Sequence, residues 1–135
     1  MVPRRVHISL AKARLIELAS KIALGSGHPH FHHGALLVKS GKVLNWSSNY
    51  PQFNSFAAKF FYPREHASLH AEIGCLLGMN RQSTEGADIL VIRIKKQGQL
   101  GTSKPCGMCI NAAKFCGIKR IFYSTDSGLE VLGLR

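Results

Sequence analysis

The chain of 135 residues is long enough for one domain over residues 1–135 and too short for two of ordinary size. It has 18 Lys and Arg against 7 Asp and Glu, so its formal net charge is +11. This charge favours a polyanionic partner. The simpler alternative is that the positive charges only keep the surface solvated. No apolar run reaches the roughly 20 residues that span a bilayer and the first residues lack a secretory signal, so we expect a cytoplasmic protein with no membrane partner.

Hydrophobic periodicity and turn residues predict alternating helices and strands. Apolar residues recur every three or four positions from 9 to 24, where Ser9 can cap a helix, and short branched apolar runs indicate strands. In chain order the expected elements are a helix at 9–24, a histidine-rich loop at 28–33, strands at 35–39 and 43–48, an irregular aromatic segment at 49–66, a helix at 68–79, a strand at 89–94, a helix at 105–116, and strands at 121–124 and 129–134.

This order of elements predicts an α/β domain in three layers, with helices on both faces of the sheet. The end of the chain indicates how the last two strands pair. A crossover to a parallel strand needs about a dozen residues, and few remain after Arg120. The turn at 125–128 therefore predicts an antiparallel hairpin at the C-terminal end.

A close pair of cysteines is the strongest chemical signal in the sequence. Cys106 and Cys109 lie three residues apart at a predicted helix start, so both sulfur atoms can face one point. A helix N-terminus favours negative charge and so prepares thiolates for a cation. His70 opens another predicted helix and can add an imidazole. Three protein ligands leave the fourth tetrahedral position of Zn²⁺ for water, which is typical of catalytic zinc.

Glu72 follows one of these ligands closely and is expected to carry protons rather than bind the metal. Zinc can lower the pKa of water from about 16 to near 7, and a carboxylate beside it can take the released proton and pass it on. Two alternatives stay open. A structural zinc site would take Cys75 or Cys116 as a fourth ligand, and a thioredoxin-like redox pair would use the two close cysteines alone.

The His-Ala-Glu motif at 70–72, followed by Pro-Cys-Gly-Met-Cys at 105–109, resembles the cytidine deaminase superfamily. The resemblance extends over nearly the whole chain, because the order of elements matches as well as the two motifs. It implies a three-layer α/β/α fold with a five-stranded mixed sheet and the zinc site between the second and third helices. It also implies a hydrolase of C–N bonds in cyclic amidines, in which Glu72 moves the protons of hydrolytic deamination.

The resemblance further implies residues that contact the substrate. Asn49 matches the asparagine that closes the second strand and bonds a sugar hydroxyl, with Asn45 as the fallback. The backbone of Ala71 is expected to touch the base. Ser103 and Lys104, just before the cysteine motif, are expected to meet the exocyclic amine.

Features that separate the branches of the superfamily conflict in this sequence. Pro-Cys-Gly resembles deaminases of free nucleosides, which usually place a cysteine where His70 stands, whereas Pro-Cys-x-Met-Cys resembles tRNA adenosine deaminases, which have a longer C-terminus. The predicted terminal hairpin is similar to the branch of nucleoside deaminases and of bacterial toxin deaminases that act on nucleic acid. It argues against the branch of tRNA adenosine and deoxycytidylate deaminases.

These features favour deamination of cytosine in single-stranded DNA or RNA. Positive charge can follow a phosphate backbone, and rings in the segment 50–62, interleaved with Lys59 and Arg64, can stack on bases, although packing of these rings in the core is an equal alternative. The histidines at 28–33 are expected to form a surface loop rather than a second metal site. The alternative substrates are free cytidine, deoxycytidine or their monophosphates, and then adenosine in tRNA. A non-catalytic zinc or nucleic-acid binding module is the alternative from another class.

Overall fold

The computed structural model describes residues 4–5, 10–63 and 68–135, so the predicted helix cap Ser9 and the basic residue Arg64 lie outside the described residues. The helices are α1 (Leu10–Leu24), α2 (Ala71–Gly74), α3 (Arg81–Thr84) and α4 (Gly107–Phe115), with a 3₁₀ turn, η1, at Ala57–Lys59. The strands are β1 (Arg4–Arg5), β2 (His32–Lys39), β3 (Lys42–Ser48), β4 (Tyr50–Phe53), β5 (Ser68–Leu69), β6 (Asp88–Ile94), β7 (Leu100–Gly101), β8 (Arg120–Thr125) and β9 (Gly128–Gly133).

The main sheet is mixed and has the strand order β1-β9-β8-β6-β2-β3, with β7 paired to the end of β6. Strands β6 and β8 run parallel, and every other described neighbour in this sheet is antiparallel. The expected five-stranded sheet is therefore present as β3-β2-β6-β8-β9, extended by the two-residue strands β1 and β7. Strands β4 and β5 form a small separate sheet beside it.

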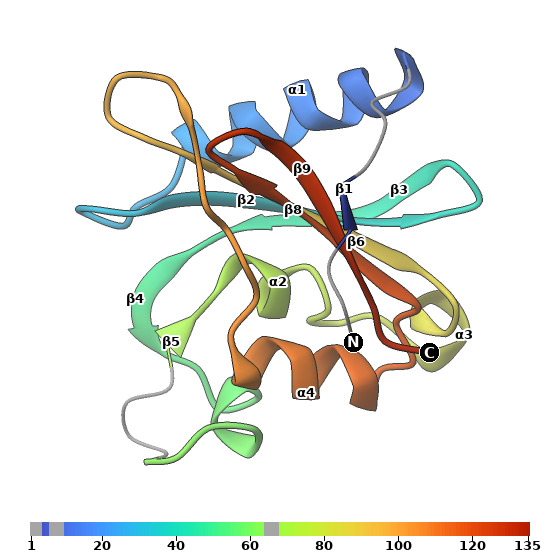
Figure 1. Ribbon diagram of the computed structural model, residues 1–135. Helices are drawn as coiled ribbons and strands as arrows, with labels where there is room; N and C mark the ends of the chain where they lie inside the picture. The colour runs from blue at the N-terminus through green and yellow to red at the C-terminus, as the bar shows by residue number, and fades with distance from the viewer. Residues whose placement is uncertain (1–3, 6–9, 64–67) are drawn as a thin grey trace.

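The sheet is covered on both faces, as the alternation of elements predicts. Figure 1 shows α1 on one face, and α2 and α4 on the other. The α1 face is closed by small side chains, Ala19 and Ala23, packed with Leu36 and Ile92 of the sheet. A second buried cluster joins α2 and α4 to the opposite face. Among the described helices, none is long and apolar enough to cross a bilayer.

The C-terminal hairpin is confirmed. Strand β9 returns antiparallel to β8, with Thr125 opposite Gly128 at the turn and Arg120 opposite Gly133 at the open end. Because the chain reverses directly, the last strand lies at the β8 edge without a crossover helix, which Figure 1 shows in red.

Several predicted boundaries are wrong, each for a local reason. The helix expected at 68–79 is only the short α2, because Ser68 and Leu69 pair as β5 and the chain after Gly74 continues in tight turns, whose N–H groups bond three residues back, up to the positive φ of Gly78. The loop predicted at 28–33 is shorter, because its last two histidines belong to β2, where His33 pairs with Arg93 of β6. The aromatic segment contains β4 and η1 rather than being wholly irregular. The helix expected at 105–116 begins only at Gly107.

Candidate functional site

Two helix starts meet on the face of the sheet opposite α1. His70 is the residue before α2 and Cys106 is the residue before α4, and both have extended backbone angles. Neither side chain makes a capping hydrogen bond to its own helix, so the imidazole and the thiol are free to face each other. Cys109 lies one turn into α4 and is fully buried. The predicted arrangement of the close cysteines at a helix start is what the structure shows.

The three side chains have the spacing of a zinc site. Nδ1 of His70 lies 3.6 Å from Sγ of Cys106 and 3.4 Å from Sγ of Cys109, and all three ligand atoms lie within 4.8 Å of one another. A tetrahedral zinc ion, at about 2.0 Å from nitrogen and about 2.3 Å from sulfur, holds such a pair of ligands about 3.6 Å apart. The donor set and its dimensions therefore fit zinc.

The protonation of the cluster also suits a divalent cation. A hydrogen bond from Cys109 lowers the pKa of Cys106 to about 4, whereas the same contact and burial raise the pKa of Cys109. The hydrogen bond to Cys106 raises the pKa of His70. One thiolate is thus already formed, and binding of zinc releases the protons that remain on the ligands.

Glu72 lies at the same place but outside the ligand group. It is the second residue of α2, its side chain is only 5% exposed, and burial raises the pKa of its carboxyl group. The positive charge of His70 acts in the opposite direction on this pKa, as expected for a carboxyl group beside the cluster. A carboxyl group with a raised pKa beside a metal site is suited to accept and return a proton near neutral pH.

No fourth protein ligand joins the cluster within the part of the chain that the structure describes. The group of metal-binding side chains there comprises His70, Cys106 and Cys109 alone. Cys75 is buried and donates its thiol hydrogen bond to the carbonyl group of Glu72. Cys116 is the C-terminal cap of α4, at the far end of the helix from the cluster. The geometry therefore favours an open zinc site over a closed structural one.

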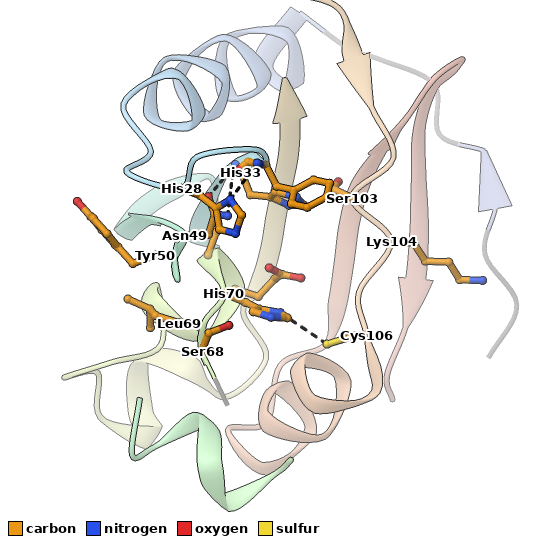
Figure 2. A pocket seen from close by; sticks show the side chains of 13 residues that line it. His28, His33, Asn49, Tyr50, Ser68, Leu69, His70, Ser103, Lys104 and Cys106 are labelled. Carbon is orange, nitrogen blue, oxygen red and sulfur yellow. Dashed lines mark hydrogen bonds between the residues drawn. The ribbon is translucent and has the colours of Figure 1, made fainter. Parts of the chain in front are cut away.

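A cavity of about 230 Å³ opens directly onto this cluster. Figure 2 shows it from close by, with His70 and Cys106 on one side. Of the residues predicted for the site, Cys109 is buried outside the lining, and the others line the cavity: Asn49, His70, Ala71, Glu72, Ser103, Lys104 and Cys106.

Asn49 is engaged in a network of hydrogen bonds at the cavity wall. Its Oδ1 accepts from Oγ of Ser26 at 2.6 Å and from the backbone N–H of His33 at 3.0 Å. Its Nδ2 donates to the carbonyl group of Phe31 at 2.9 Å. The fallback Asn45 is not in the lining, and its amide donates to the carbonyl group of Cys75. The structure therefore favours Asn49 of the two.

The pair before the cysteine motif presents backbone more than side chain to the cavity. The Ser103 hydroxyl group donates to the carbonyl group of Val91 at 2.9 Å and contacts the Ser124 hydroxyl group, so it is occupied inside the protein. Lys104 is exposed, and Figure 2 shows its side chain directed away from His70. Both residues line the cavity, as predicted.

The loop between α1 and β2, called the first loop below, and the start of β2 also supply lining residues that the sequence did not assign, namely His28 and Phe31 of the loop and His33 of the strand. Nδ1 of His28 accepts from the backbone N–H groups of His30 and Phe31, so the neutral ring carries its proton on Nε2. Figure 2 shows the rings of His28 and His70 on opposite sides of the cavity. The histidine-rich composition of this stretch was the available signal, but it did not distinguish residues that face the cavity from those that do not.

The aromatic segment is divided between core and surface. Phe56 and Phe60 pack edge to face, with ring centroids 5.4 Å apart, and lie against the core cluster. Tyr50 lines the cavity with 44% of its surface exposed, and Phe53 and Tyr62 are more exposed still. Part of the segment therefore packs in the core, and stacking of the exposed rings on bases stays a prediction.

The chain is similar to one family model and to several solved structures. The model of the cytidine and deoxycytidylate deaminase zinc-binding region matches residues 10–125. The dCMP deaminase of cyanophage S-TIM5 has a similar fold in its apo form, with 22% identity and a TM-score of 0.58 over 84% of this chain and 81% of that one. The structure of the same enzyme in complex with dCMP and dUMP is 21% identical, with a TM-score of 0.59, and the match covers 87% of this chain and 83% of that one. Acinetobacter baumannii RibD, form 1, is 17% identical, with a TM-score of 0.49, and the match covers 83% of this chain and 26% of that one. No curated protein matches the chain.

Proposed function

Because the chain belongs to the family of the cytidine and deoxycytidylate deaminase zinc-binding region, we propose that it is a zinc-dependent hydrolytic deaminase that converts cytosine to uracil in single-stranded nucleic acid. The observation that carries the proposal is the union of three zinc-type ligands with a buried carboxyl group at the floor of one cavity. Hydrolytic deaminases of nucleobases need this combination, a metal to activate water and a carboxylate that is not a ligand to move protons.

The proposed metal ligands are Nδ1 of His70 and the sulfur atoms of Cys106 and Cys109. Zinc bound there supplies a Lewis acid that makes water a nucleophile at neutral pH. The chain supplies the proton transfers. The Glu72 carboxylate takes a proton from the attacking water and gives it to the ring nitrogen of the base. It then takes the second proton of the former water, which is now the hydroxyl group on the ring carbon, and gives it to the amino group, which leaves as ammonia. Its burial keeps bulk water from competing for these protons.

The remaining predicted contacts position the base and its sugar. The backbone of Ala71, fully buried at the start of α2, is proposed to hold the edge of the base. The main chain of Ser103 and Lys104 meets the exocyclic amine. Asn49 has one amide N–H left after its bond to the carbonyl group of Phe31, and this group is available to a sugar hydroxyl.

A polynucleotide substrate is supported by exposed rings beside the cavity and by the charge. The cavity, of about 230 Å³, can take one extruded nucleoside while its neighbours in the strand stay outside. Phe31 and Tyr50 leave 47% and 44% of their surfaces exposed at its wall, where adjacent bases can stack. The net charge of +11 attracts a phosphate backbone.

Free deoxycytidine monophosphate is the second candidate. The specific observation in its favour is the similar fold of a phage dCMP deaminase whose structure was solved with dCMP and dUMP. The terminal hairpin counts against this second candidate, because a strand that returns antiparallel resembles the branch that holds deaminases of nucleosides and of nucleic acid and not the deoxycytidylate branch.

A substrate panel separates the candidates. Zinc-loaded protein is incubated with cytidine, dCMP, single-stranded DNA and single-stranded RNA that each contain cytosine, and with an adenosine-containing RNA stem-loop. We expect uracil to accumulate fastest in one of the single-stranded polymers. Turnover of dCMP alone would replace the first candidate by the second, and inosine as the main product would contradict both.

A further inference from the structure

Arg93 lies close to the cavity although it belongs to the centre of the sheet. It stands on β6, where it pairs with His33 of β2 on one side and Gly101 of β7 on the other. Val91, two residues earlier, belongs to the buried cluster under α2 and α4, so the alternation of a strand directs Arg93 to the same face. Its guanidinium carbon lies 5.0 Å from the ring centroid of Phe31, which lines the cavity.

The charge of Arg93 has no acidic partner in the part of the chain that the structure describes. The ion pairs found there join Lys21 to Glu17, Arg81 to Glu85, Lys95 to Asp126 and Arg120 to Asp88. Moreover, Nε of Arg93 is buried without a hydrogen-bond acceptor. A buried donor without an acceptor is unfavourable, and for a guanidinium group the natural acceptors are carboxylate and phosphate oxygens.

The two histidines that line the cavity near Arg93 do not compete with it for an anion. Burial and the charge of Arg93 lower the pKa of His33 to about 4. Burial likewise lowers the pKa of His28, whose ring lies 5.4 Å from that of Phe31. Both histidines are therefore neutral at pH 7. An anion that approaches the cavity beside Phe31 meets the charge of Arg93, which is held against that ring, and Lys104 adds an exposed second cation at the lining.

We propose that Arg93 binds a phosphate attached to the target nucleoside, and that Phe31 holds the guanidinium group in place at the cavity wall. This subsite rests on the proposed function, because it takes the cytosine of the same nucleotide to be the group at the metal cluster. The planar guanidinium group can give two hydrogen bonds to one phosphate, which a lysine cannot reproduce. The phosphate is a diester in a polynucleotide and a monoester in a free nucleotide, and the chemistry of the contact is the same.

Binding experiments test the subsite without turnover. Zinc-loaded Glu72→Gln protein is titrated with deoxycytidine, with dCMP and with a single-stranded oligonucleotide that contains one cytosine, at several salt concentrations. The same titrations are repeated after adding Arg93→Met. The matched control is Arg14→Gln, which removes one positive charge from an exposed position on α1, on the other face of the sheet.

We expect Arg93→Met to weaken phosphate-bearing ligands by about tenfold or more, because a charge-assisted hydrogen bond is lost, and to leave deoxycytidine unchanged. For the oligonucleotide the slope of log K against log salt should fall by about 0.7. A loss confined to the oligonucleotide assigns Arg93 to a phosphodiester, and a loss for dCMP as well assigns it to the phosphate of the target nucleotide.

Equal weakening of deoxycytidine and the phosphate-bearing ligands, or the same effect from Arg14→Gln, would overturn the subsite. Arg93→Lys, compared at equal zinc content and equal thermal stability, guards against a folding defect and should recover only part of the affinity. Phe31→Leu should weaken the same ligands as Arg93→Met. If wild-type protein deaminates none of the substrates while Arg93 still governs phosphate binding, the proposed function fails and the subsite stands.

Discussion

At the scale of single residues, the Asn49 side chain joins two parts of the cavity wall. It follows β3 directly, and its amide group forms hydrogen bonds with Ser26 and Phe31 of the loop between α1 and β2 and with His33 of β2. The side chain is only 8% exposed and yet lines the cavity, so it can support the loop and contact a ligand at once. Its effect on turnover therefore has two separable parts.

Comparison of Asn49→Ala with Ser26→Ala separates these parts. Ser26 donates to Asn49 but is absent from the lining, so Ser26→Ala loosens the loop without removing a group that reaches the substrate. We expect Ser26→Ala to raise KM by about fivefold, the worth of one neutral hydrogen bond, and Asn49→Ala to raise it by about tenfold or more. Steady-state kinetics on the preferred substrate provide the measurement. Equal effects of the two variants would confine Asn49 to supporting the loop.

His33 gives the fold a specific pH dependence. Burial and Arg93 lower its pKa from 6.5 to about 4 in the folded protein. Between these two values the unfolded chain binds a proton that the folded chain does not, so stability falls as the pH drops from about 6.5 to 4. The contribution is about 3 kcal/mol at pH 4. His33→Gln removes it, and urea unfolding of metal-free protein at pH 7 and pH 4 should show a correspondingly smaller loss. Parallel pH profiles for wild type and variant would contradict this account.

The residues around the metal cluster differ in how far the sequence could predict them. Cys106 and Cys109 were predictable because a spacing of three residues at a helix start fixes their relative positions, and His70 was predictable because its motif and the cysteine motif together resemble those of the family. Arg93 was not, because its approach to Phe31 depends on the register of β2 against β6 and on the path of the first loop. Long-range pairing of this kind has no local sequence signal.

At the scale of elements, the close packing of α1 on β2 depends on one glycine. A Cβ atom added at Gly34 would lie 2.6 Å from the backbone nitrogen of Ala23, and it would contact the carbonyl oxygen of Ala19 even more closely. Both atoms belong to the α1 backbone and cannot rotate away. Position 34 must therefore be glycine if the helix is to lie this near the sheet.

Gly34→Ala should destabilise the protein by at least about 3 kcal/mol, because α1 must move away from the core that it covers. Gly133→Ala is the matched control, since no heavy atom lies within 4 Å of a Cβ atom there and φ is not positive. Chemical denaturation of both variants provides the measurement. A change below about 1 kcal/mol at Gly34 would show that the helix adjusts easily.

The elements also show where local patterns mislead. The terminal hairpin was predictable because a short chain end and a turn left no room for a crossover. The helix expected at 68–79 was not broken in the prediction, although Gly74 and Gly78 stand within it. Gly74 allows α2 to approach Ser47 of β3, and Gly78 ends the turn with a positive φ. The need for glycine at both positions comes from packing and backbone geometry that a hydrophobic pattern does not contain.

At the scale of the whole molecule, family membership and the three-layer fold agree on a zinc-binding deaminase. The extent of one domain over residues 1–135 stays a prediction, as does the polynucleotide substrate. The net charge of +11 gives the proposed polynucleotide substrate a physical basis, because the release of counterions from a phosphate backbone favours binding at low salt.

The central claim is that zinc and Glu72 together hydrolyse the amino group of cytosine. The most direct test compares zinc-loaded wild-type protein with Glu72→Gln protein of equal zinc content, with ammonia release and mass spectrometry of a cytosine-containing single-stranded oligonucleotide as readouts. We expect uracil and ammonia in equal amounts from the wild type, and turnover lower by at least about 100-fold in the variant, since proton transfer by a positioned side chain contributes about this much or more. Undiminished turnover by Glu72→Gln would contradict the account.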